Sequence, residues 1–263
     1  MSRNDIVKTI ALLFATTLSI ASYSQNTCNL LQVINGATGS TIAYIYDNNN
    51  HVTGLTMTGG GVTANYAVTT NEQGYATAMA IQGMAATGWV LNKASLTYDI
   101  NHNLIKEEVY LGTSAVPTIT EIRKYNSAGQ MVHMKQISSW ATPEGKVNTG
   151  YNYNIFTYPN ATTKNPSKIT IHSGTDTEMK PEPDQITEFT YDDKKTADSH
   201  SANDYEAFAI NNVISAAITY VNSNVNENRV STFEYNAQGY PTSRTYKANG
   251  GKTCVDTYSY NCK

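Results

Sequence analysis

The sequence lacks the short motifs that most catalytic and cofactor-binding sites carry. It contains no Gly-x-Ser-x-Gly elbow, no His-Glu-x-x-His zinc site, no Cys-x-x-Cys pair, no phosphate loop and no dinucleotide-binding glycine pattern. The run Gly59-Gly60-Gly61 has neither the lysine nor the strand–helix setting of a phosphate loop, so it predicts a flexible turn. We therefore expect no cofactor and no catalytic residue, and we interpret the protein as non-enzymatic.

Charge is also scarce. Lys, Arg, Asp and Glu make up 15% of the residues and the formal net charge is -3, so nothing indicates binding to nucleic acid. Adjacent carboxylates such as Glu107-Glu108 point to opposite faces of a strand, so they predict no paired-carboxylate site. The five histidines are scattered without metal-ligand spacing, and we expect no metal site; they are His51, His102, His133, His172 and His200.

Long apolar runs are absent beyond the first 24 residues, so we expect no transmembrane helix in the mature protein. At the start of the chain, Arg3 and Lys8 accompany the apolar stretch 9–21, and Ser22-Tyr23-Ser24 offers small residues where a signal peptidase reads. We predict that residues 1–24 are a signal peptide and that the mature protein is secreted, periplasmic or displayed at the cell surface.

Only three cysteines occur, all beyond the predicted signal peptide. In an oxidising compartment we expect one disulfide and one remaining thiol. We favour Cys28–Cys262, because this bond would join the two chain ends across a long loop, which the chain-entropy model values at roughly 5 kcal/mol. Cys28–Cys254 is the second choice. Cys254–Cys262 is disfavoured, since the extended run between these cysteines has no turn signal and would hold them too far apart.

Tyrosine, in contrast, is abundant, with 19 residues against 5 Phe and 2 Trp. Tyrosine suits strands that are buried on one side and meet water at the rim. We interpret most of these residues as sheet packing, and a tyrosine-lined ligand surface is the alternative.

One turn-like segment recurs between runs in which apolar and polar residues alternate. Close copies are Thr70–Tyr75, Tyr125–Gln130 and Tyr235–Tyr240, and looser copies are Tyr46–His51 and Tyr98–Asn103. In each, an Asn or Asp side chain can accept a hydrogen bond from the backbone two residues on, and a later residue must take positive φ. We predict positive φ at five structural turn residues: Asn50, Gly74, His102, Gly129 and Gly239.

These hairpins predict an all-β fold. We expect one domain over 25–263, built as an antiparallel up-and-down meander of roughly 14–16 strands. So wide a sheet rarely stays flat and open, which favours a closed or half-closed barrel. The succession of alternating strands and tight turns becomes irregular at 173–211, and we predict an irregular excursion there. It includes an exposed loop at 173–184 and a mobile polar segment at 192–203. Function is more expected there than in the regular hairpins.

The repeated hairpin unit resembles a known one. Tyr44-Ile45-Tyr46-Asp47, with the related 189–192, 233–236 and 258–261, resembles the YD repeat of Rhs-type bacterial proteins. The Cys-x-Leu start and the Tyr-x-Tyr-Asn-Cys ending are similar to a narrower group, uncharacterised secreted envelope proteins of Gram-negative bacteria with a porin-like β-meander fold. The chain departs from these groups in its degenerate glycine turns. The resemblance implies a fold and an envelope location, and it implies no catalytic residues.

Three classes of function follow. We favour a non-enzymatic envelope protein that binds a lipid, a glycan or a protein partner of unknown identity. An outer-membrane pore is an alternative, although Lys106, Glu121, Arg123 and Lys168 interrupt strands that would have to face lipid. A hydrolase with an unrecognised carboxylate site is the other alternative, and a cleft with two carboxyl groups about 5–10 Å apart would support it.

Overall fold

The computed structural model describes residues 28–83, 90–141, 146–197, 209–223, 225–247 and 251–262. The predicted signal peptide lies outside these residues, as does 198–203 of the predicted mobile segment. The described residues form sixteen strands: β1 (Cys28–Ile34), β2 (Thr41–Tyr46), β3 (Val52–Gly59), β4 (Val62–Thr70), β5 (Ala76–Gln82), β6 (Leu91–Tyr98), β7 (Leu104–Leu111), β8 (Ile119–Tyr125), β9 (Met131–Ala141), β10 (Val147–Thr157), β11 (Lys168–Gly174), β12 (Gln185–Lys195), β13 (Asn211–Tyr220), β14 (Val225–Tyr235), β15 (Pro241–Lys247) and β16 (Thr253–Cys262).

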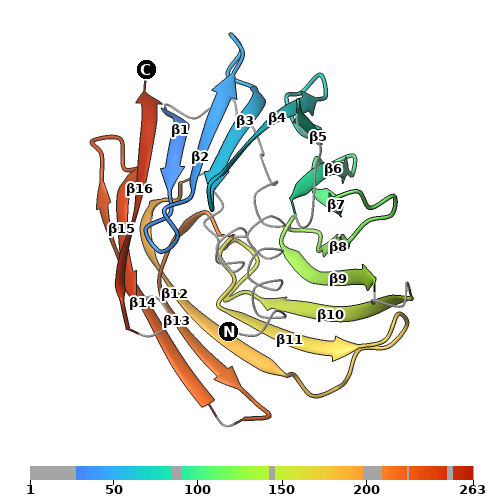
Figure 1. The fold of residues 1–263 in the computed structure, drawn as a ribbon. Helices are drawn as coiled ribbons and strands as arrows, with labels where there is room; N and C mark the ends of the chain where they lie inside the picture. The colour runs from blue at the N-terminus through green and yellow to red at the C-terminus, as the bar shows by residue number, and fades with distance from the viewer. Residues whose placement is uncertain are drawn as a thin grey trace.

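Each strand pairs antiparallel with the next one in the sequence, and β1 pairs with β16, so the sheet closes into a barrel (Figure 1). The predicted up-and-down meander is confirmed, and of the two expected forms the structure has the closed one. Within the described ranges, no helix is both long and apolar enough to cross a membrane.

The two ends of the barrel are built differently. Because alternate strands run in opposite directions, all connections from an even-numbered to an odd-numbered strand lie at one end, which we call the turn end. The tight segments 47–51, 71–75, 99–103, 126–130 and 236–240 lie there. Connections from odd-numbered to even-numbered strands lie at the opposite end, the loop end. Cys28 begins β1 and Cys262 ends β16, so both belong to the turn end.

The tight turns share one hydrogen-bond scheme. In 126–130, the Asn126 N–H donates to the Gln130 carbonyl at 2.9 Å, and the Gly129 N–H donates to the Asn126 carbonyl at 3.0 Å. Asn126 Oδ1 also accepts from the N–H groups of Ala128 and Gln130. The φ angle is positive at all five structural turn residues: 65° at Asn50, 84° at Gly74, 63° at His102, 70° at Gly129 and 80° at Gly239.

Closure turns the alternation along each strand into an inner and an outer face. On β8, Ile119, Glu121 and Arg123 are buried, whereas Ile122 and Lys124 between and beyond them are exposed. The largest buried apolar cluster lines the inner wall from β3 to β8 and includes Leu55, Met79 and Val109. A second cluster runs from β9 to β13, and a third joins β1 and β16.

The irregular excursion predicted for 173–211 is shorter in the structure. Strand β11 runs to Gly174 and β12 runs to Lys195, so residues 192–195, which we predicted to be mobile, continue a strand. The reason is long-range pairing: Lys195 pairs with Asn211 of β13 across a bulge that the local composition does not signal.

Replacing Gly239 by alanine is expected to lower the free energy of unfolding by about 1 kcal/mol, because an L-residue in the left-handed region costs about that much. An added Cβ would meet no atom within 4 Å, so the loss of stability comes from the strained backbone conformation alone and not from a steric clash. Urea denaturation measures the change. Gln238→Ala in the same turn is the control, because Gln238 is exposed and lacks a positive φ. Equal effects of the two substitutions would contradict the turn assignment.

Candidate functional site

The barrel wall has one discontinuity, at β14. The ladder between β13 and β14 covers Ser215↔Val230 to Tyr220↔Val225, and the ladder between β14 and β15 begins only at Ser231↔Tyr246. Among the described residues, none of β14 therefore belongs to both ladders. Every other strand of the barrel has at least one residue paired on both sides. At the turn end, this offset leaves the backbones of β13 and β14 unpaired with each other, and we call this place the seam.

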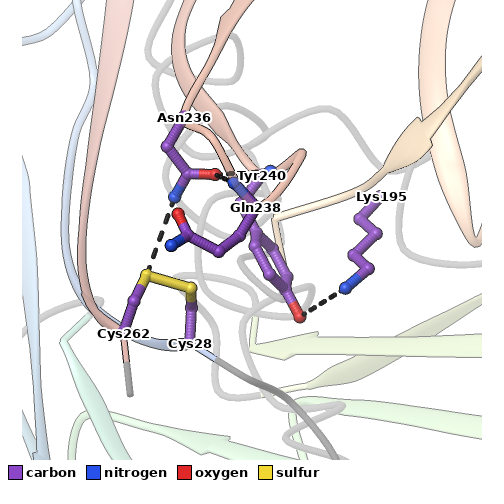
Figure 2. Close-up of a disulfide and its surroundings, with 6 residues drawn as sticks. All are labelled: Cys28, Lys195, Asn236, Gln238, Tyr240 and Cys262. Carbon is purple, nitrogen blue, oxygen red and sulfur yellow. Dashed lines mark hydrogen bonds between the residues drawn. A yellow bond between two sulfur atoms is a disulfide. The ribbon is translucent and has the colours of Figure 1, made fainter.

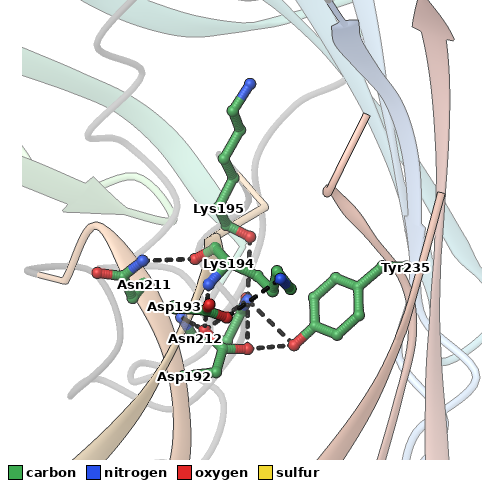
Figure 3. A network of polar contacts seen from close by, with 7 residues as sticks. All are labelled: Asp192, Asp193, Lys194, Lys195, Asn211, Asn212 and Tyr235. Carbon is green, nitrogen blue, oxygen red and sulfur yellow. Dashed lines mark hydrogen bonds and ion pairs between the residues drawn. The ribbon is translucent and has the colours of Figure 1, made fainter. Parts of the chain in front are cut away.

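Polar side chains bridge the seam (Figure 3). The Tyr235 hydroxyl at the end of β14 donates to Asp192 Oδ2 on β12. Asn212 of β13 lies between them: its Nδ2 is 3.1 Å from Asp192 Oδ2 and 2.9 Å from the Lys195 carbonyl, and its backbone N–H donates to Asp192 Oδ1 at 3.1 Å. Burial and the bond to the Asp192 carboxylate raise the pKa of Tyr235, so it remains a donor. Three strands are thus joined through side chains where the backbone ladder is missing.

Tyr235 departs from a regular tyrosine ladder at the turn end. In five other even-numbered strands, a tyrosine near the turn end donates its hydroxyl to a backbone carbonyl at or near the start of the preceding strand. These bonds are Tyr46 to Leu30 (2.7 Å), Tyr98 to Ala76 (2.9 Å), Tyr125 to Leu104 (2.9 Å), Tyr158 to Met131 (3.0 Å) and Tyr191 to Pro166 (2.6 Å). Because β13 is not paired beside it, Tyr235 reaches the Asp192 carboxylate instead.

The disulfide lies beside the tight turn 236–240 (Figure 2). Cys28 and Cys262 are bonded, with a Cα–Cα distance of 3.9 Å, and Cys254 is a free, buried cysteine. The favoured disulfide is therefore the one formed. The side chain of Asn236 contacts Cys262 Sγ at 3.7 Å. Nearby, Lys195 Nζ lies 3.4 Å from the Tyr240 hydroxyl and 4.5 Å from the centre of its ring.

A second polar cluster lies buried in the wall of β7 to β9. Arg123 Nη2 donates to Glu107 Oε2 at 2.8 Å and to Glu121 Oε2 at 2.6 Å, and Gln136 donates to Glu121 Oε1 at 3.2 Å. Glu107 is 1% exposed, and its Oε1 has no hydrogen-bond partner among the described residues. Glu121 and Arg123 share the inner face of β8 with the buried Ile119, and the sequence alternation does not by itself say which face that is.

Two carboxyl groups share one guanidinium here. Burial, opposed by Arg123 and reinforced by the neighbouring Glu121, raises the pKa of Glu107 to about 8. Glu121 also accepts from Gln136 and is the better satisfied carboxylate. At neutral pH Glu107 is therefore protonated, and Arg123 donates to both carboxyl groups.

This cluster lacks the access that hydrolysis requires. Two close carboxyl groups are the usual pair for glycoside hydrolysis. Both side chains, however, are at most 7% exposed. The arrangement acts as a structural ion pair, in which Arg123 offsets the cost of burying Glu121.

A third buried set joins β14 to β16. Arg244 Nε donates to Ser231 Oγ at 3.0 Å, and Asp256 Oδ1 accepts from the Gly36 N–H at 2.8 Å and from the Tyr246 hydroxyl at 3.3 Å. Burial raises the pKa of Asp256, against the effect of the Gly36 N–H and Arg244. These bonds attach the β1–β2 loop to the inner wall.

The residues singled out in the sequence are dispersed. The five turn residues lie in separate hairpins of the turn end, whereas the two cysteines meet in the disulfide, and Glu121 meets Arg123 in an ion pair. The sequence analysis named four charged residues that would interrupt a lipid-facing apolar band. Of these, Lys106 and Lys168 lie on the outer face, whereas Glu121 and Arg123 lie on the inner face. Among the described residues, no three His, Cys, Asp or Glu side chains form a metal site.

No family model and no curated protein matches the chain. Among solved structures, a porin-like protein from Bacteroides uniformis is 14% identical, with a TM-score of 0.49 over 89% of this chain and 95% of its own. A porin-like protein from Bacteroides vulgatus is 11% identical, with a TM-score of 0.37 over 88% and 98%. A TcdB2–TccC3 structure is 10% identical, with a TM-score of 0.34 over 86% of this chain and 14% of its own. Likenesses this low carry no argument about function, and the resemblance to the YD repeat remains an expectation.

Substituting Glu107 by Gln is expected to flatten the pH dependence of stability. The folded state holds the Glu107 proton up to about pH 8, whereas the unfolded state releases it near pH 4.5. The folded wild type therefore binds more protons across this window, and its free energy of unfolding falls as pH rises through it, by an amount on the order of a few kcal/mol.

The measurement is urea denaturation of wild type and Glu107→Gln between about pH 4.5 and pH 8. Glu234→Gln on the exposed outer face is the control and should keep the wild-type slope. Parallel curves for Glu107→Gln and wild type would show that Glu107 is ionised in the fold.

Tyr235→Phe is expected to speed amide hydrogen exchange in residues 231–235, because the seam loses the bond to Asp192 where no backbone ladder supports β14 on the β13 side. Tyr158→Phe is the control, since it removes a bond to a backbone carbonyl beside the ladders of β10, which have no register shift. Unchanged exchange in Tyr235→Phe would mean that the network does not hold the seam.

Proposed function

We propose that the protein is an exported, non-enzymatic envelope barrel that works in water and binds a partner at its turn end. The observation that carries the proposal is the polar outer face. Charged side chains on β6, β7, β8, β11, β12, β14 and β15 interrupt any apolar band on that face; they are Lys93, Lys106, Glu108, Lys124, Lys168, Glu188, Glu234 and Lys247. A barrel that spans a membrane needs a continuous outward apolar band about 25 Å tall.

The pore alternative is weaker for the same reason. Moving a lysine to the middle of a bilayer costs roughly 2–4 kcal/mol, and these lysines are distributed around the barrel. The disulfide adds support for export, because such bonds persist in oxidising compartments. The hydrolase alternative loses its support in the burial of Glu107 and Glu121.

The turn end is the favoured binding region. On either side of the connection between β12 and β13, Ala197 and Ala209 are buried at 6% and 8% exposure. Beside it, the Lys195 ammonium lies against the ring of Tyr240, which in turn packs on Tyr260 at 5.4 Å between ring centres. An ammonium group with neighbouring aromatic rings suits a glycan, a lipid headgroup or a peptide.

The first test is detergent-free extraction of the mature protein from the cells that produce it, followed by ultracentrifugation and native mass spectrometry. We expect the protein in the soluble fraction with a bound molecule or protein partner. Sedimentation with membranes that only detergent reverses would favour the pore instead. Native protein without any ligand or partner would contradict the binding role.

The binding region is tested by Lys195→Met combined with Tyr240→Leu, which should lose the bound species. Lys124→Met on the exposed face of β8 is the control and should retain it. Retention by both variants would place binding elsewhere.

A further inference from the structure

Trp140 lies at the loop end of β9 and remains 44% exposed. It shares the inner face with Gln136, which donates to the buried Glu121. Trp140 pairs with Asn148 of β10, and its indole reaches diagonally across the ladder to Gly150. A Cβ at Gly150 would lie 3.3 Å from Cζ3 and 3.4 Å from Cη2 of Trp140. The indole therefore rests against the bare backbone of Gly150, and a side chain there would displace it.

Asparagine side chains continue this inner face of β10 on both sides of Gly150. Asn148 precedes Gly150 by two residues, and Asn152 and Asn154 follow it at the same interval, so successive positions are about 7 Å apart. Asn152 is exposed, and its amide makes no hydrogen bond to another residue in the described part of the chain. Asn154 Oδ1 is buried and has no hydrogen-bond partner among the described residues. A buried acceptor of this kind costs free energy until a donor reaches it.

The chemistry of this face matches a neutral ligand. From Gln136 to Trp140 on β9 and from Asn148 to Asn152 on β10, every inward side chain is uncharged. An amide group both donates and accepts, as a hydroxyl does, so asparagine and glutamine suit a ligand rich in hydroxyl groups. The face of an indole attracts the weakly positive C–H groups of a sugar ring.

Other ligand classes fit this face less well. An anionic headgroup would meet no cation within these two stretches, and a fatty chain would need a continuous apolar wall where amides alternate with the indole. An extended peptide adds to the backbone edge of a sheet, whereas the groups offered here are side chains on its face. A neutral saccharide satisfies both the indole and the amides.

We propose that the inner face of β9 and β10 at the loop end binds a neutral saccharide. Trp140, held in place over Gly150, supports a sugar ring, and the amides of Asn148 and Asn152 bind its hydroxyl groups. The site lies at the opposite end of the barrel from Lys195, so it is independent of the binding region at the turn end.

Binding is tested by isothermal titration calorimetry of the exported protein with maltohexaose, cellohexaose, xylohexaose, mannohexaose and chitohexaose. We expect at least one of these neutral sugars to bind, and Trp140→Ala to raise its dissociation constant about tenfold or more. Thr149→Ala is the control and should bind as wild type does, because Thr149 is exposed on the outer face of the same strand. Absence of binding by all five sugars, or unchanged binding by Trp140→Ala, overturns the proposal.

The position of the sugar is tested by fluorescence in a Trp89→Phe background, where Trp140 is the only tryptophan of the chain. We expect the bound sugar to change the emission of Trp140. Gly150→Ala should weaken binding because its Cβ displaces the indole, and Asn152→Ala should weaken it in a protein whose thermal unfolding is unchanged, because Asn152 is exposed. Unchanged emission at saturating sugar, or wild-type affinity in both variants, overturns the site.

Discussion

Pairing between β1 and β16 is the interaction on which the rest of the structure depends. Without it, the sheet would have two open edges and no interior. With it, each strand has an inner and an outer face, so successive side chains of a strand point alternately into the core and into water. The apolar clusters, the buried charges and the tyrosine bonds at the turn end all require that division. The disulfide Cys28–Cys262 holds this one pairing covalently.

The ring of backbone hydrogen bonds is least continuous at β14, and the chain uses side chains there. Asp192, Asn212 and Tyr235 replace ladder bonds with a network in which a carboxylate accepts from an amide, a hydroxyl and a backbone N–H. Such a network fixes a single arrangement of the strands only when each of its polar side chains has a hydrogen-bond partner, and Asp192, Asn212 and Tyr235 each have one. The seam at the turn end has one geometric origin, the offset between the two ladders of β14.

Much of the fold could be predicted because it is local. An Asn or Asp followed by a glycine, or by Asn50 and His102, defines each tight turn within a few residues, and two such turns bound a hairpin. The disulfide could be predicted because an up-and-down meander brings its ends together. The offset of β14 could not, because it depends on the relative lengths of neighbouring hairpins. The prediction that residues 192–195 are mobile was wrong because their strand depends on a distant partner, β13, which the local sequence does not indicate. Nor does alternation alone say that Glu121 and Arg123 face inward, since either side of a strand can become the interior.

The position of the disulfide makes the covalent structure cyclic. Cys28 and Cys262 occupy the place of one more connection at the turn end, where Tyr260 and Leu30 face each other as strand neighbours do within a hairpin. Followed through its bonds, the oxidised chain from Cys28 to Cys262 returns to its starting point after one circuit of the wall. The first and last strands are then as closely connected as any two successive ones. Reduction would change the topology of the molecule from a ring to a line without removing a single backbone hydrogen bond.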